Sequence, residues 1–237
     1  MLQALALAAV LAQAQAAPVP PAIPLRTLIY ATEYDVVSRR ERLNSPVANA
    51  TQPRATAAPA GYARPPSAIA GRLRIDLIAV EPDGIVFDTS LSGGRVQPTI
   101  RVGVTNDGLL RYDAAGGNLS PEVRRLMPLM ARGLLADRHV ESGVTWRVPE
   151  DPPMQGESRT TVVHANAEIA DLRIDRDRSD LHGYDDHAVI TVVYARRLLD
   201  PRSFTYEARI RRPAGLDAVE TTRVKYTAEL VSDSVSP

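Results

Sequence analysis

The chain has 237 residues, of which 44% are hydrophobic and 24% charged, a composition that suits one folded domain and excludes an intrinsically disordered chain. Its 28 basic and 28 acidic residues cancel, so it lacks the basic excess that phosphate contacts require, and we expect no nucleic-acid partner. Cysteine is absent, which excludes disulfides, thiolate metal sites, a cysteine nucleophile and the lipid-bearing cysteine of a bacterial lipoprotein.

The N-terminus has the pattern of an export signal followed by a tether. Residues 5–12 form a short apolar run, and small residues follow at the spacing that signal peptidase prefers. This predicts a signal peptide at residues 1–16, cleaved after Ala14 or Ala16; no Lys or Arg precedes the run, and a buried helix is the alternative. The prolines of residues 17–26 stop a helix from continuing and predict a tether. We therefore expect an exported bacterial protein, periplasmic or extracellular, without a lipid anchor.

The protein is not expected to be an integral membrane protein. The apolar run at residues 5–12 is shorter than the roughly 20 residues that a helix needs to span a bilayer. Aromatic residues make up only 5% of the chain and form no girdles in the sequence.

From residue 27 onward, apolar and polar side chains alternate with a period of two, which is typical of strands with one buried face. Pro-Asp-Gly at residues 82–84 and Asn-Asp-Gly at residues 106–108 predict tight turns, which join antiparallel neighbours in a meander. Residues 44–67 have almost no large apolar side chain and predict a flexible surface loop. Strands are expected at residues 28–36, 72–79, 85–91, 100–104 and 110–112.

The pattern changes to helical spacing at residues 120–135. Ser120 can cap a helix and Pro121 suits its first turn, while Pro128 should kink or restart it. The apolar stripe should dock on the sheet and leave Arg124, Arg125 and Arg132 outward; a membrane or partner surface is the alternative. The stripe consists of Val123, Leu126, Met127, Met130 and Leu134.

Strand patterns resume at residues 144–148 and continue to residue 230. Residues 161–174 need a bulge because their apolar positions shift from odd to even, and residues 188–199 are apolar enough to be covered on both faces. The clearest alternation occurs at residues 204–210 and 224–230. In total we expect eight to ten strands in one β-rich domain at residues 27–237. Its predicted fold is mainly β (α+β): an antiparallel meander forming a half-barrel or barrel-like sheet, with one amphipathic helix inserted at about 120–135.

A polar stretch at residues 175–187 is the strongest candidate for metal binding. Its first aspartates match the start of a calcium loop, but Asp180 stands where that loop requires glycine and Asp186 where it requires glutamate. Its histidines and carboxylates can instead hold a divalent transition metal if they converge in a loop. The interpretation we favour is a solvated polar loop between strands. The candidate ligands are Asp175, Asp177, His182, Asp185 and His187.

No motif of catalysis is present: the chain has no G-x-S-x-G elbow, H-E-x-x-H helix or Gly-rich phosphate loop. A non-catalytic protein without a cofactor is therefore favoured over an enzyme. All basic residues except Lys225 are arginine, whose planar fork recognises phosphate or carboxylate. Because the arginines are spread along the chain, we interpret them as the composition of a GC-rich genome.

Two features resemble known protein groups. The meander interrupted by one helix at residues 120–135 is similar to the lipoprotein-carrier proteins of the periplasm, and Gly143, Val144, Thr145 and Trp146 look like the G-x-[ST]-W step of secreted bacterial β-rich proteins of unknown function. The first resemblance covers most of the mature chain and implies a half-barrel whose concave face holds acyl chains under a helix. It is architectural, so no binding residue carries over.

These observations predict a non-catalytic envelope protein that binds an amphiphilic or apolar ligand, or a partner, between the sheet and the helix. The expected partner is a lipid or apolar small molecule, or another envelope protein. A structural or assembly component of the envelope is the first alternative, and a metal-dependent hydrolase using residues 175–187 is the second. The candidate ligand-binding residues are Met127, Met130, Leu134, Trp146, Tyr206 and Tyr226.

Overall fold

The computed structural model describes residues 23–42, 69–112, 118–131, 135, 138–150, 152–196, 200–215 and 218–235. The predicted signal peptide and the predicted loop at residues 44–67 lie outside these residues, as does most of the predicted tether.

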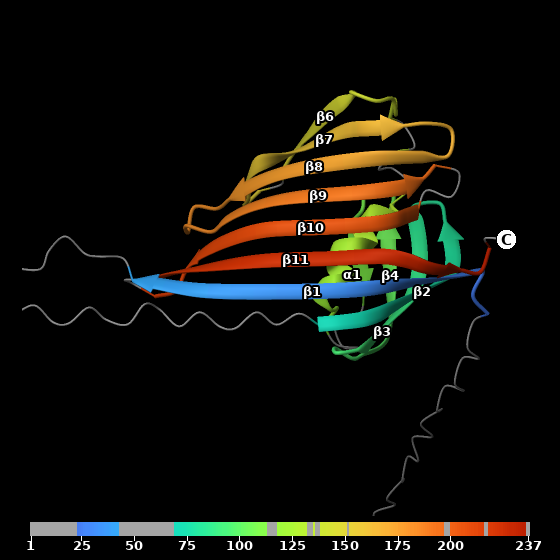
Figure 1. Cartoon of the computed structure of the whole chain (residues 1–237), viewed down its shortest axis with the longest axis horizontal. Coiled ribbons are helices and arrows are strands. Elements are labelled where there is room, and N and C mark those ends of the chain that lie inside the picture. The colour runs from blue at the N-terminus through green and yellow to red at the C-terminus, as the bar shows by residue number, and fades with distance from the viewer. Residues whose placement is uncertain are drawn as a thin grey trace, which may run out of the picture.

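Eleven strands form a single antiparallel sheet in the order β5-β4-β3-β2-β1-β11-β10-β9-β8-β7-β6 (Figure 1). One short helix, α1 (Pro121–Leu126), continues into the 3-10 helix η2 (Met127–Met130). The predicted mainly β fold, an antiparallel half-barrel sheet with one inserted helix, is confirmed. The strands are β1 (Arg26–Arg42), β2 (Ile69–Glu81), β3 (Gly84–Gly93), β4 (Gln97–Thr105), β5 (Leu110–Tyr112), β6 (Thr145–Pro149), β7 (Gln155–Ala165), β8 (Ile169–Ser179), β9 (Asp185–Ala195), β10 (Asp200–Pro213) and β11 (Ala218–Asp233).

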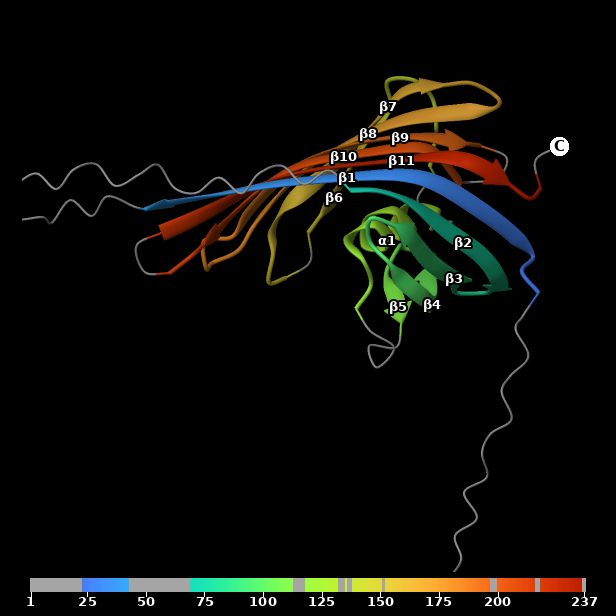
Figure 2. The same cartoon turned by 60° about the horizontal axis from the view of Figure 1, so that its bottom comes forward.

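The order of the strands explains where the helix lies. Strand β1 pairs with β2 on one side and with β11 on the other, so the first and last strands meet in the middle of the sheet. Strands β5 and β6 are consecutive in the chain but form opposite edges. The connection between them contains α1 and η2, which lie on the concave side of the curved sheet (Figure 2). The helix therefore packs inside the half-barrel.

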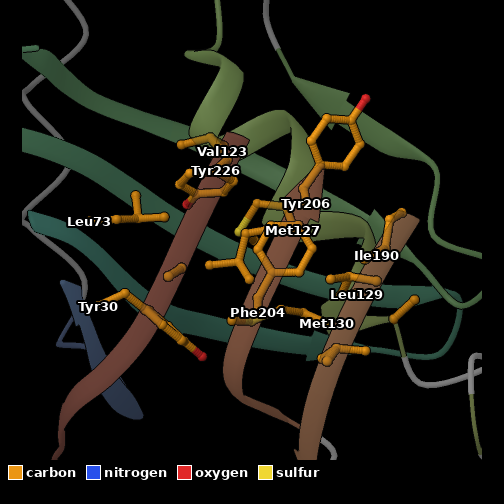
Figure 3. Close-up of a cluster of buried hydrophobic side chains, with 14 of the residues drawn as sticks. Tyr30, Leu73, Val123, Met127, Leu129, Met130, Ile190, Phe204, Tyr206 and Tyr226 are labelled. Atoms are coloured by element: carbon orange, nitrogen blue, oxygen red, sulfur yellow. The ribbon is translucent and has the colours of Figure 1, made fainter. Parts of the chain in front are cut away.

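The buried face of the sheet follows the alternation predicted from the sequence. On β1, Leu28, Tyr30 and Tyr34 are buried, and the even-numbered apolar residues of β10 and β11 face the same interior. In Figure 3, Met127, Met130 and Val123 from the helical segment pack among Phe204, Tyr226 and Leu73 from the sheet. One hydrophobic core thus joins the helix to both halves of the sheet.

The helical segment is shorter than predicted. The Ser120 side chain accepts a hydrogen bond from the Val123 backbone N–H, as expected of the cap, but the α-helix ends at Leu126. Pro128 lies in η2, which ends before Ala131 turns to extended backbone. A proline inside a helix removes a backbone donor, so a change of helix type at this point is expected. Among the described residues no helix is both long and apolar enough to cross a membrane.

Residues 161–174 belong to two strands, not to the single strand that the sequence pattern predicts. The predicted irregularity is present, because the register of the β7–β8 pair shifts between Val162 and His164. The chain reverses between β7 and β8, where the Asn166 side chain accepts hydrogen bonds from the backbone N–H groups of Glu168 and Ile169. This turn raises the number of strands to eleven. On β7, Val162 is buried and Val163 is exposed, the reverse of the prediction.

Strand β9 is buried on one face only, contrary to the prediction of burial on both. Ala188 and Val192 are buried, whereas Val189 and Val193 on the outer face are half-buried. Apolar residues on the outer face make the sequence look doubly covered, but no second layer of the described residues lies over that face (Figure 2).

Candidate functional site

A groove of about 900 Å³ lies on the concave side of the sheet, between the helical segment and strands β8, β9 and β10. We call it the inner groove. Its apolar wall includes Leu129 from η2, Ile174 from β8 and Ile190 from β9. Its polar wall includes four arginines. These arginines are Arg124 and Arg125 on α1, and Arg176 and Arg178 on β8.

Inward-facing residues cross the sheet beside the inner groove in three successive rows, which change from apolar to charged. The first row consists of the paired neighbours Tyr34, Tyr226, Tyr206, Ile190 and Ile174. The second row consists of Val36, Val224, Ala208, Ala188 and Arg176. The third row consists of Ser38, Thr222, Ile210, Asp186 and Arg178. Strand register therefore places a cationic cluster directly next to an apolar floor.

The cationic end of the groove is built on one buried carboxylate. Asp186 is fully buried, and its Oδ2 accepts hydrogen bonds from Arg178 Nε at 2.8 Å and Arg176 Nη2 at 3.1 Å. Asp186 Oδ1 and Arg176 Nε have no hydrogen-bond partner among the described residues. Two guanidinium groups thus share one carboxylate oxygen, which leaves a net positive charge at this place.

Aromatic rings orient the arginines that face the groove. The Arg125 guanidinium lies 5.3 Å from the ring centroid of Tyr34 and 4.7 Å from that of Tyr206. Arg176 lies 5.9 Å from the same Tyr206 ring and donates to its hydroxyl at 3.3 Å. In Figure 3 the Tyr206 hydroxyl points away from the packed side chains of the core. Cation–π contacts of this kind hold a guanidinium in place without neutralising it.

The charge states of the neighbouring groups follow from these contacts. Burial lowers the pKa of Arg178, but the charge of Asp186 and its hydrogen bond outweigh burial, so the pKa of Arg178 is raised. Burial, together with the charge of Asp186, raises the pKa of the Tyr184 hydroxyl. At neutral pH Arg178 is therefore charged and the Tyr184 hydroxyl is neutral.

Of the five predicted ligand-binding residues that the structure describes, Tyr206 alone lines the inner groove. Met127, Met130 and Tyr226 are buried in the core that supports the groove. Trp146 is half-buried on β6, under the guanidinium of Arg138 at 5.5 Å from the ring centroid. The sixth residue, Leu134, lies outside the described residues.

The predicted metal ligands are spread over two strands and a turn. Asp175 pairs with Arg173 on β8, and the pKa of Asp175 is lowered mainly by that hydrogen bond. Asp177 contacts His187 across the β8–β9 pair. The strands continue to Ser179 and resume at Asp185, so the predicted loop at residues 175–187 is a hairpin with a short turn.

His182 and Asp185 do not join this pair. His182 lies in the turn, where its backbone N–H donates to Asp180, and Asp185 is the exposed first residue of β9. Within the described part of the chain, no three side chains of His, Asp or Glu converge to hold a metal ion. Of the five predicted metal ligands, the structure therefore brings together only Asp177 and His187.

Sequence reasoning misses the arginines of the inner groove. The sequence pattern predicts that Arg125 faces outward and that Arg176 and Arg178 belong to a polar loop, and both predictions are wrong. The sequence does contain a signal for them, because Ile174, Arg176 and Arg178 are two residues apart and so point to the same face of a strand. Since Ile174 faces the core, the two arginines lie on the core side of β8.

Comparisons by sequence identify no relative, since no family model and no curated protein matches the chain. Among solved structures, the fold is similar to that of lipovitellin, in a structure that concerns lipid–protein interactions in lipovitellin. The TM-score is 0.51 and the identity is 10% over 91% of this chain. This chain spans 26% of the length of that chain, so the likeness shows a shared fold alone.

Proposed function

We propose that this chain is an exported, non-catalytic protein that binds an amphiphilic or apolar ligand in the inner groove. The observation that carries the proposal is the groove itself: about 900 Å³ of space with an apolar wall beside a polar one. That size falls in the range of about 300–1,000 Å³ typical of sites for small molecules. The shared fold with lipovitellin, a protein studied for its interactions with lipid, supports the same proposal.

A neutral naphthylamine dye, whose fluorescence rises in apolar surroundings, tests the binding step. We expect saturable binding of the dye and displacement by a 12-carbon alcohol. Ile210→Asn, which changes a half-buried lining residue, should weaken dye binding about tenfold because it removes apolar contact. Val231→Asn, at an exposed position on β11, serves as the matched control and should leave binding unchanged. Absence of saturable binding to the parent protein would contradict the proposal.

Two further measurements test the identity of the ligand and the export of the chain. Solvent extraction of the protein from its native host, followed by mass spectrometry, should recover a stoichiometric amphiphile. N-terminal sequencing of that protein should begin after Ala14 or Ala16, and a chain that keeps residues 1–16 would contradict export.

A structural or assembly component of the cell envelope is the second candidate function. The observation that favours it is the pair of sheet edges, β5 and β6, neither of which has a second strand neighbour in the described part of the chain. An edge strand can pair with a strand of another protein. Stoichiometric co-purification of one partner, together with failure of the dye to bind, would favour this function over ligand binding.

A further inference from the structure

We propose that the ligand of the inner groove is a lipid-like amphiphile with an anionic head group, a carboxylate or a phosphate, received by Arg124, Arg125, Arg176 and Arg178. This inference rests on the proposed function and specifies the ligand's head group, which the shape of the groove leaves open.

The charge of the groove lining points to an anion. Four arginines line the groove, and no Asp, Glu or Lys is found among its described lining residues. Asp186 lies buried behind the lining and is already shared between Arg176 and Arg178. One carboxylate against four guanidinium groups leaves an excess of positive charge where the apolar wall lowers the effective dielectric constant. The arginines therefore attract an anion placed there more strongly than they would attract it in water.

The two arginines of α1 have hydrogen-bond donors that no described residue accepts from. Among the described residues neither Arg124 nor Arg125 has a carboxylate within salt-bridge distance, whereas Arg95, beside the same helix, pairs with Glu122. Arg125 donates from Nη1 to the Tyr34 hydroxyl and the Pro121 carbonyl, both at 3.3 Å. Its Nε and Nη2 donors make no hydrogen bond to a described residue. The rings of Tyr34 and Tyr206 hold it in position, so little side-chain entropy is lost when it binds an anion.

The arrangement along β8 orients the amphiphile. The inward face of this strand carries Ile174, then Arg176, then Arg178 toward the strand end. An acyl chain therefore fits over Ile174, Ile190 and Leu129, with its head group between α1 and the end of β8. A free inorganic anion pairs with the arginines but leaves the apolar wall exposed to water. A molecule with both an anionic head group and an apolar chain pairs with the arginines and also covers that wall.

Displacement of the naphthylamine dye by 12-carbon ligands of matched length tests the inference. The probes are dodecanoate, monododecyl phosphate and dodecanol, all below their micelle concentrations, together with inorganic phosphate. We expect the two anionic amphiphiles to bind about tenfold more tightly than the alcohol, from one additional charge-assisted contact. The difference should shrink at high salt, because part of the attraction is between groups that water can screen. A comparison of the affinities of dodecanoate and monododecyl phosphate shows which of the two head groups the groove prefers.

Two variants separate the head group from the tail. The double change Arg124→Gln and Arg125→Gln removes two positive charges. The triple change Arg176→Gln, Arg178→Gln and Asp186→Asn removes two positive charges and one negative charge. Each variant should reduce the anionic preference to about threefold or less while dodecanol affinity stays within twofold. Arg72→Gln, at an exposed position on β2 outside the groove lining, lowers the net charge by the same amount as the triple variant and should change neither affinity. The triple variant removes the buried acid together with both arginines that pair with it, which keeps a folded protein available if the first variant does not fold.

The outcomes distinguish the two proposals. If all three amphiphiles bind equally, or if the anionic preference survives both variants, the head-group inference is overturned while the ligand-binding function stands. If inorganic phosphate binds as tightly as dodecyl phosphate, the site is a simple anion site and the inference is equally overturned. If no amphiphile displaces the dye, or the dye does not bind, the proposed function fails and the inference fails with it.

Discussion

The long strands of the sheet have two ends that are stabilised in different ways. Near α1 and η2, which we call the covered end, the inward residues Tyr34, Tyr206 and Tyr226 are buried under the helical segment. Strands β1, β10 and β11 continue well past the helix, toward the left in Figure 1. At this uncovered end the inward residues include Ser38, which shares a hydrogen bond with Thr222.

The two ends differ in the interactions that stabilise the inward face of the sheet. Where a helix excludes water, apolar side chains supply the stability, at about 25 cal/mol per Å² of buried apolar surface. Where no helix covers the concave face, the strands carry polar side chains that bond to each other. Ser38 on β1 bonds to Thr222 on β11, and Asp186 on β9 bonds to Arg176 and Arg178 on β8. The inner groove lies at the boundary between the two ends, which explains why one of its walls is apolar and the other cationic.

The largest effect is expected at the boundary ion cluster. Changing Arg176 and Arg178 together to Leu leaves Asp186 buried without a cationic partner, and we expect a loss of about 3–5 kcal/mol in the free energy of unfolding. Urea denaturation measures the loss. Adding Asp186→Leu removes the unpaired charge and should restore most of the stability. An equally unstable triple variant would show that the arginines act by packing and not by charge.

A comparison of two truncations tests the covered end. Leu126→Ala, at a fully buried position in α1, should lower the free energy of unfolding by about 3 kcal/mol through lost burial and the cavity left behind. Ile210→Ala, at a half-buried position toward the uncovered end, should cost about 1 kcal/mol. Urea denaturation of each variant and of the parent protein measures the two losses. Equal costs at the two positions would contradict the division of the sheet into covered and uncovered ends.

The smallest expected effect concerns an ion cluster where β1, β10 and β11 meet. Arg26 bonds to Asp200 at 3.2 Å and to Asp233 at 2.6 Å, and burial raises the pKa of Asp200 above its ordinary value of 3.8, although Arg26 opposes that shift. The folded state therefore binds a proton at Asp200 more readily than the unfolded state does. Between the raised pKa and 3.8, this residue adds stability as the pH falls.

Asp200→Asn isolates that contribution from those of other carboxylates. The free energy of unfolding of the parent protein minus that of the variant should increase as the pH is lowered from 7 toward 3.8. Chemical denaturation at each pH measures the difference. A difference that decreases over this range would mean that Arg26 dominates over burial.

Much of the fold is predictable because alternation is a local property. Side chains of a strand point to opposite faces in turn, so Leu28, Tyr30, Phe204 and Tyr226 can be assigned to one buried face without knowing which strands are neighbours. The local signal fails where a turn lacks glycine and proline. Asn166 makes the β7–β8 reversal look like a bulge.

The site is much less predictable. Tyr206 is a candidate for its aromatic ring on an inward face, and it does line the inner groove. Arg125 and Arg176 escape prediction because their partners, the rings and Asp186, come from other strands. A charged residue on a strand pattern looks solvated until its cross-strand neighbours are known.

The sequence by itself determined that the protein is a β-rich domain with one short amphipathic helix, and which face of most strands is buried. Only the tertiary structure decided that β1 pairs with β11, that β5 and β6 form opposite edges, and that the helix consequently lies inside the curve. Alternation depends on neighbours two residues apart, whereas pairing joins residues such as Tyr34 and Tyr226 that are far apart in the chain. The groove and its arginines arise from those distant pairings, which periodicity along one strand does not encode.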